Sequence, residues 1–256
     1  MRNFVYIFPV VFLIMSSLRA QAPAVSTLEK NEQLYRDVME IRIQIFRIDR
    51  DKIYEMHQPG FSLIQEDLAE AIGILEEKLG SLENRLHLVE TQNQLEQAVK
   101  LWDNLRFHAL AKLDKKSFAR FFYDTKTFDS FLEIMLNKME DKFGFKAKKY
   151  ADMRANYEAI RNLYIMNVGY MTDKYPVNKS FEKLFYQSKS KVAEYLESMK
   201  SRKSFKDEKT ARYLAKSLNE WKFLRFNMSN GFIPAERTVF ASVSTMHFYL
   251  SKLFNE

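Results

Sequence analysis

The two tryptophans of the chain lie in nearly the same local sequence, 119 residues apart. Trp102-Asp-Asn-Leu-Arg-Phe107 in the first half corresponds to Trp221-Lys-Phe-Leu-Arg-Phe226 in the second. Upstream of each tryptophan, Pro59 and Pro176 end long helical patterns at a spacing of 117 residues. Landmarks that recur in the same order at nearly constant spacing indicate two tandem copies of one structural unit.

The first copy reads as four helices with apolar stripes at helical spacing. The first is predicted over residues 27–57, with a seam at Leu34, Val38, Ile41, Ile45 and Ile48. The second begins at Ser62 and the third at Thr91, each with a glutamine three residues on, the pattern of a capping box. The fourth begins at Asp114, is expected to break near residues 124–125, and ends at Gly144.

The second copy predicts helices over residues 150–173, 178–200, 207–228 and 234–254. Asn230-Gly231 is typical of a helix end, and Pro234 suits a first helical turn. Strict two-residue alternation over a strand length is absent from the sequence. We therefore expect an all-α fold, a tandem duplicated antiparallel helical bundle with about four helices per copy. The units would be residues 27–144 and 147–255, either in series or as one long bundle.

The first 22 residues have the layout of a secretory signal peptide. Arg2 is followed by an apolar run over residues 4–15 and by small residues around Ala20 and Ala24, which predict cleavage between residues 20 and 24. The apolar run is shorter than the roughly 20 residues that span a bilayer. No later segment reads as a membrane span, so the sequence predicts a periplasmic or secreted chain without a membrane span after cleavage.

Composition excludes several kinds of site. The chain has no cysteine and only 6 glycines, which excludes cysteine-ligated metals, a cysteine nucleophile and most glycine-rich phosphate loops. Loss of Arg2 and Arg19 lowers the formal net charge from +7 to +5, and the charges are interspersed. Export and the absence of a clustered basic stripe argue against a nucleic-acid partner.

Sequence motifs give no reason to expect an enzyme. The four histidines lack the spacings that build zinc or di-metal sites in helices, so no metal and no cofactor is predicted. Nucleophile-elbow and Walker motifs are absent as well. Glu83 and His87, four residues apart, are expected to form a surface pair.

The repeated Trp-x-x-Leu-Arg-Phe motif admits two interpretations. In the first, Trp102, Phe107, Trp221 and Phe226 are core residues, and the arginines lie at the rim with their stems packed and their heads in water. In the second, Arg106 and Arg225 face polar clefts and bind an anion, because a guanidinium makes two parallel hydrogen bonds to an oxyanion.

Two further arginines on the opening helices, Arg42 and Arg161, are candidates for the same anion chemistry. Arg47 and Arg154 accompany them. A solvated face is the favoured position for these arginines, with a position inside the bundle as the alternative. The fourth helix of the first copy is rich in phenylalanine and is expected to lie in the core, although the aromatic content also suggests an apolar face shared with a partner.

The order of elements resembles the periplasmic sensor module of type IV pili methyl-accepting chemotaxis transducers and of nitrate-sensing histidine kinases. Phe61 and Phe181 open second helices and Trp102 and Trp221 lie in third helices, as in that family, and residues 165–171 resemble its Met-rich first helix. The Ala-Gly-Arg-Gln-Arg-Met core of the family signature is absent from both copies. The resemblance covers residues 29–255 and implies a duplicated helical bundle that senses an anion.

Two hypotheses for function follow. The leading one is an exported, non-enzymatic, sensor-like bundle that binds a small ligand, an anion among them, or a partner protein such as an envelope protein or a membrane receptor. The alternative is a structural or scaffolding envelope protein whose aromatic fourth helices dock another protein.

Overall fold

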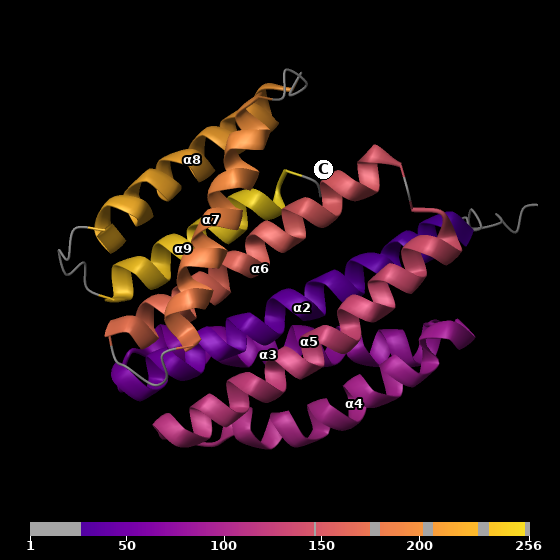
Figure 1. The fold of residues 1–256 in the computed structure, drawn as a ribbon, viewed down its shortest axis with the longest axis horizontal. Helices are drawn as coiled ribbons and strands as arrows, with labels where there is room; N and C mark the ends of the chain where they lie inside the picture. Colours follow the sequence, from indigo (N-terminus) through magenta and orange to yellow (C-terminus); the bar gives the residue numbers. More distant parts are fainter. Residues whose placement is uncertain (1–26, 146, 175–179, 202–206, 230–235, 254–256) are drawn as a thin grey trace, which may run out of the picture. The chain divides into compact units, whose positions relative to one another are not determined.

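Long apolar stripes with few helix breakers give an all-helical chain, as predicted. The computed structural model describes residues 27–145, 147–174, 180–201, 207–229 and 236–253, and this part contains helices and no strand. The helices are α2 (Thr27–His57), α3 (Ser62–Arg85), α4 (Val89–Leu110), α5 (Lys115–Phe143), α6 (Lys148–Lys174), α7 (Ser180–Ser201), α8 (Glu208–Ser229) and α9 (Glu236–Ser251) (Figure 1). The predicted signal peptide, Pro176, Asn230-Gly231 and Pro234 lie outside the described residues.

The helix starts follow the spacing that a duplication predicts. The first residues of α6, α7, α8 and α9 lie 121, 118, 119 and 121 residues after those of α2, α3, α4 and α5. The four helices of the second half thus follow those of the first in the order and at the spacing that a duplication predicts, with α6 in the place of α2 and α9 in the place of α5.

The helix ends differ from the sequence expectation at three places. Phe61 precedes α3 and Leu88 precedes α4, and neither makes a side-chain cap, so the predicted capping boxes at Ser62 and Thr91 are wrong. Asp114 does cap α5, in a capping box with Ser117. The predicted break near residues 124–125 is absent because α5 continues unbroken to Gly144, whose φ of 70° ends it in the left-handed region.

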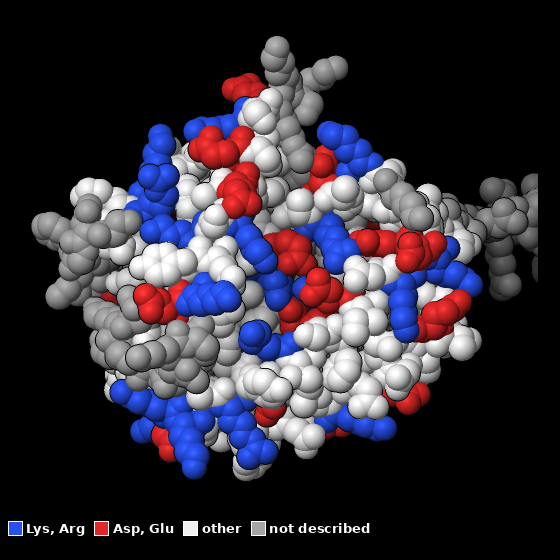
Figure 2. Space-filling model, viewed as in Figure 1, with Lys and Arg blue, Asp and Glu red and all other residues white. Residues whose placement is uncertain are grey.

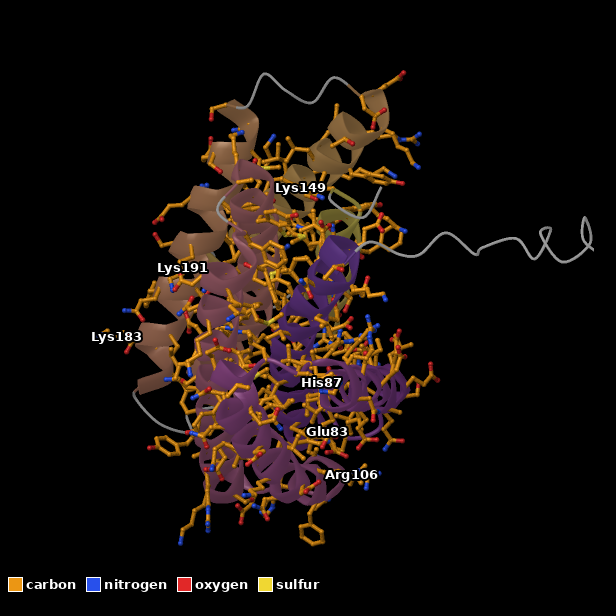
Figure 3. All side chains as sticks on the ribbon, turned by 90° about the vertical axis from the view of Figure 1, so that its right-hand side faces the viewer. Glu83, His87, Arg106, Lys149, Lys183 and Lys191 are labelled. Atoms are coloured by element: carbon orange, nitrogen blue, oxygen red, sulfur yellow. The ribbon has the colours of Figure 1, made fainter. Side chains whose placement is uncertain are left out.

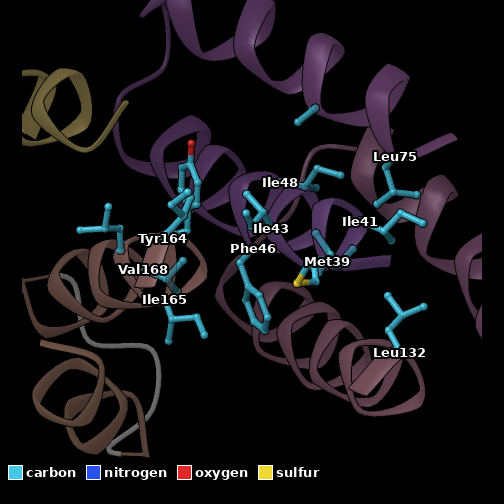
Figure 4. Packing of buried hydrophobic residues seen from close by; sticks show 14 of the residues in the cluster. Met39, Ile41, Ile43, Phe46, Ile48, Leu75, Leu132, Tyr164, Ile165 and Val168 are labelled. Atoms are coloured by element: carbon cyan, nitrogen blue, oxygen red, sulfur yellow. The ribbon is translucent and has the colours of Figure 1, made fainter. Parts of the chain in front are cut away.

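Helix α2 lies among α3, α5, α6 and α9, and nearly all of its residues from Leu34 to Tyr54 are buried (Figure 1). Contacts of Arg42 with Asp129 and of Asp49 with Thr125 show that α2 and α5 are antiparallel. Figure 4 shows apolar side chains leaving α2 in several directions, toward Leu75 on α3, Leu132 on α5 and Ile165 on α6. A helix that is covered on all sides by other helices buries its whole circumference.

The two copies contact each other through reciprocal aromatic pairs. Phe61 at the start of α3 packs on Phe240 of α9, with ring centroids 5.4 Å apart. Phe181 at the start of α7 packs on Phe122 of α5, with centroids 4.8 Å apart. In each pair a phenylalanine at the start of the second helix of one half contacts a phenylalanine in the fourth helix of the other half.

By contacts the chain divides into residues 1–33 and residues 34–256. In the first of these units, only residues 27–33 are described, and they form the start of α2. The second unit includes helices of both copies. No helix in the described ranges has the length and apolarity needed to cross a bilayer.

Candidate functional site

The central helix α2 carries charged side chains into the bundle. Arg42, Arg47, Asp49, Arg50 and Asp51 are all buried, and the Arg42 side chain is 2% exposed. The solvated face that the sequence favoured for Arg42 and Arg47 is therefore wrong, and the alternative inside the bundle is correct. The physical reason is that α2 has helices on several sides and leaves no face for solvent.

One ion cluster joins two of the predicted anion-binding arginines. Asp129 on α5 accepts hydrogen bonds from Arg42 Nε at 2.7 Å and from Arg161 Nε at 3.2 Å. Glu158 contacts both guanidinium groups, and Glu133 lies 3.4 Å from Arg42 Nη2. Burial alone would raise the pKa of Asp129, but Arg161 and Arg42 overcome it and hold this pKa below its usual value. Three carboxylates thus face two guanidinium groups, which leaves no positive charge for an external anion.

A second ion cluster follows one to two turns later on α2. Arg47 and Arg50 both contact Asp67 on α3, and Arg47 also contacts Glu70. Arg50 lies 3.9 Å from the ring centroid of Phe240, and its Nη1 donates to Ser244 Oγ at 2.9 Å. The two arginines of this cluster thus have Asp67, Glu70 and the buried Asp51 as acidic partners within the chain, as the arginines of the first cluster do.

Burial acts on the titratable groups of this second cluster. It raises the pKa of Asp51 well above its usual value, with help from Asp67 and against the effect of Arg50. Next to this cluster, Tyr164 OH lies 2.6 Å from Nδ1 of His247. Burial, together with Arg47 and Arg50, lowers the pKa of His247 to about 3. His247 is therefore neutral near pH 7 and fills a packing and hydrogen-bonding role.

Arg50 and Asp51 were not singled out from the sequence, although a signal for them exists. Between the predicted seam residues of α2 lie the further apolar residues Met39, Ile43 and Phe46, and Ile53 follows the seam. Apolar residues on every face of a helix indicate that it is buried all round. The charged residues in that stretch must then be buried and paired.

Arg106 lies on α4, away from both clusters. Its side chain is 55% exposed, and its Nε lies 2.5 Å from Glu76 Oε1 on α3. This contact is an ion pair without hydrogen-bond alignment, because Glu76 Oε1 has no hydrogen-bond partner. Figure 3 shows Arg106 at the lower edge of the view, far from Lys183 and Lys191, which point outward from α7. Arg106 is thus neutralised by its own chain.

Arg225 lines a groove between α7 and α8, about 500 Å³ in volume. Leu218, Trp221 and Phe226 supply its apolar lining, and Lys200, Lys222 and Glu197 its other charges. Lys200 Nζ lies 3.1 Å from Glu197 Oε1, so that acid has a partner within α7. In the described part of the chain, no carboxylate lies within ion-pair distance of Arg225.

A further cation lies near Arg225. Burial lowers the pKa of Lys189 on α7, and the positive charge of Arg225 lowers it further. The second of these effects shows that Lys189 and Arg225 are close enough to interact. On the face seen in Figure 2, by contrast, acidic and basic side chains are interspersed across the centre.

The repeated motif is only partly core. Trp102 and Trp221 are buried as expected, at 4% and 5% exposure. Phe107 and Phe226 are 72% and 61% exposed, so their assignment to the core is wrong. Five residues along a helix correspond to a rotation of about 140° from the starting side chain, which turns each phenylalanine away from the face that its tryptophan buries.

Phenylalanines of the fourth helix of the first copy lie in the core, as the sequence predicted for this helix. Phe118, Phe121, Phe122 and Phe128 on α5 are buried, and Phe122 packs against the other copy. They cannot dock another protein. Exposed aromatic side chains lie instead on α4 and α8, with others on α5, α7 and α9 (Phe107, Phe223, Phe226, Tyr123, Tyr186 and Phe248).

Metal-binding groups of three or more histidine, aspartate or glutamate side chains are absent from the described ranges. Glu83 lies in α3 while His87 lies beyond its end, and both are exposed (Figure 3). No family model, curated protein or solved structure matches the chain.

Proposed function

We propose that this chain is an exported, non-enzymatic helical-bundle protein that binds a small anion in the groove between α7 and α8. The observation that carries the proposal is the difference among the four candidate arginines. Arg42, Arg106 and Arg161 each contact a carboxylate of the chain itself. Arg225 contacts none in the described residues, and Lys222 and Lys200 line the same groove. A guanidinium with free hydrogen-bond donors is suited to bidentate recognition of an oxyanion.

Further features of the chain support export and a binding role without catalysis. The first 22 residues have the layout of a secretory leader, which supports export. The missing catalytic motifs and the paired internal acids support binding rather than catalysis. A bundle of this kind, like the sensor modules it resembles, would pass its ligand state to another envelope protein.

The test is a thermal-shift and calorimetric screen with nitrate, phosphate, acetate and larger organic anions. A ligand at 100 times its Kd stabilises a protein by about 2.7 kcal/mol, which gives a measurable rise in Tm. We expect such a rise for the native chain and for Arg106→Ala, and its loss in Arg225→Ala. An anion-induced shift that persists in Arg225→Ala, or the absence of any shift, would contradict the proposal.

The exposed aromatic residues favour protein binding as a second candidate function. Phe107 and Phe226 occupy equivalent positions in the two copies, and both are exposed beside an arginine. Exposed aromatic and arginine side chains are enriched in protein interfaces. Cross-linking in periplasmic extract with Phe107→Ala and Phe226→Ala as variants distinguishes this function, since a partner held by this surface is lost in the variants.

A further inference from the structure

The two grooves of the duplicated chain can be compared residue by residue. In α3 and α7, buried positions correspond at a spacing of 117 residues: Ile64, Leu68, Ala71, Leu75, Leu79 and Leu82 match Phe181, Phe185, Ser188, Val192, Leu196 and Met199. A pair of polar contacts agrees with this register when α2 and α6 are aligned at a spacing of 119 residues, which relates Arg42 to Arg161. Lys78 Nζ lies 3.5 Å from Asp37, and Tyr195 OH donates to Asn156 at 2.7 Å.

Applied to the grooves, this register places Ala193 where the first copy has Glu76. Arg225 corresponds to Arg106 at the tryptophan spacing of 119 residues. In the first copy a carboxylate of α3 therefore lies against the arginine of α4. In the second copy the corresponding position of α7 carries only the methyl group of Ala193. The groove of the second copy has kept the arginine and lost the internal acid.

The second groove has also gained positive charge. Lys189 takes the place of Ile72, and Lys222 takes the place of Asp103. Arg225 is close enough to Lys189 to lower the pKa of that lysine. The one acid lining this groove, Glu197, is held by Lys200. Charge complementarity therefore favours an anionic ligand in this groove. The first copy indicates the kind of anion, because the partner of Arg106 there is the carboxylate of Glu76.

We infer that the α7–α8 groove binds a monocarboxylate with an apolar or aromatic body, whose carboxylate takes the place that Glu76 occupies in the first copy. This inference rests on the proposed function and narrows its ligand class. Arg225 pairs with the ligand carboxylate, and Leu218, Trp221 and Phe226 contact its apolar part. A groove of about 500 Å³ is within the size range of small-molecule sites.

The inference yields a pair of matched variants. Ala193→Glu introduces a carboxylate at the position of α7 that corresponds to Glu76 of α3, the partner of Arg106. Ala193→Gln has the same bulk and no charge, so it controls for steric filling. Both variants are checked for unchanged helicity by circular dichroism. The probe is phenylacetate, titrated calorimetrically and by fluorescence, with the uncharged phenylacetamide as its isosteric control and acetate as the control without an apolar body.

We expect phenylacetate to bind the native chain with one site, and phenylacetamide and acetate to bind at least tenfold more weakly. Ala193→Glu should weaken phenylacetate binding at least tenfold, and Ala193→Gln much less. Equal binding to the Glu and Gln variants would overturn the inference. If phosphate or nitrate bind in an Arg225-dependent way and phenylacetate does not, the ligand class is wrong while the proposed function stands. If no anion binds in that way, both are wrong.

Discussion

Asp129 holds two guanidinium groups that approach it from different copies of the repeat, Arg42 from α2 and Arg161 from α6. All three side chains are mostly or fully buried, so each charge depends on the others for compensation. When one partner of such a group is removed, the remaining buried charge costs more than the pair had contributed. Asp129 is therefore one of the buried groups on which the contact among α2, α5 and α6 depends.

We expect Asp129→Asn to lower the free energy of unfolding by about 3 kcal/mol near pH 7, within the range for broken buried ion pairs. Because the pKa of Asp129 is lowered in the folded state, its contribution is present above the unfolded pKa of about 3.9 and is lost as pH falls below it. Urea denaturation at pH 7 and pH 3 measures this. Glu90→Gln, which breaks the exposed pair with Lys142, should leave the midpoint unchanged. A pH-independent difference would contradict the assignment.

At the scale of single residues, the sequence singled out arginines but did not show which of them have acidic partners within the chain. Arginine was the predicted anion-binding residue, but Arg42 differs from Arg225 through helices distant in sequence, which bring acids to Arg42 and none to Arg225 among the described residues. Phe107 is a different case, since its rotation relative to Trp102 follows from helical geometry and predicts exposure without any structure.

At the scale of elements, α6 and α7 approach each other closely at Gly169. A Cβ atom built at this glycine would lie 2.7 Å from Phe185 Cβ and 2.9 Å from Phe185 Cα. The obstacle includes backbone, which cannot rotate away. The equivalent residue of α2 is Arg50, whose long side chain instead enters the second ion cluster. At this position Gly169 allows two helices to pack closely in the second copy, whereas Arg50 carries a buried charge in the first.

We expect Gly169→Ala to destabilise the chain by about 1 to 3 kcal/mol, because α6 and α7 must separate to admit the methyl group. Gly73→Ala in α3 is the matched control, since nothing lies within 4 Å of its built Cβ. That control should gain up to about 1 kcal/mol from helix propensity. Thermal unfolding of both variants measures the difference, and a stabilised Gly169→Ala would show that the helices do not approach as described.

Helix existence and order were predictable, because apolar stripes at a period of 3.6 residues and proline or glycine stops are local signals. Helix α2 was predicted with the bounds that it has, Thr27–His57. Its central position was not predicted, because that depends on contacts with α5, α6 and α9 that no local pattern encodes. The two capping boxes failed because each helix begins earlier than predicted: Ser62 is already the first residue of α3, and Thr91 is the third residue of α4.

At the scale of the whole molecule, residues 34–256 form one unit and the copies are tied by several buried contacts. Tyr54 OH donates to Asn167 at 3.0 Å, and its other contact is the backbone oxygen of Glu236 at 3.1 Å. The aromatic pairs Phe61–Phe240 and Phe122–Phe181 add apolar contact at two further places. Neither copy retains these partners when alone.

We expect a chain divided between Gly144 and Ala147 to give two fragments that do not unfold cooperatively by themselves. Mixed or co-expressed, they should associate and recover a single cooperative transition, since each supplies the apolar surface that covers the other. Size-exclusion chromatography and thermal circular dichroism measure this. A sharp transition in either isolated fragment would show that the copies fold independently.

The packing of Phe61 on Phe240 and of Phe181 on Phe122 resembles the interface of a homodimer whose two subunits have been joined into one polypeptide. In a true homodimer every substitution appears in both subunits, so the two halves must serve the same role. Joined in one chain, the halves are free to specialise. The first half can commit its central helix to two buried ion clusters and pair its groove arginine with Glu76, while the second has Gly169 at a close helix contact and leaves Arg225 without an internal acid. Covalent linkage thus allows the two halves to carry different side chains at corresponding positions while their helices keep the same order.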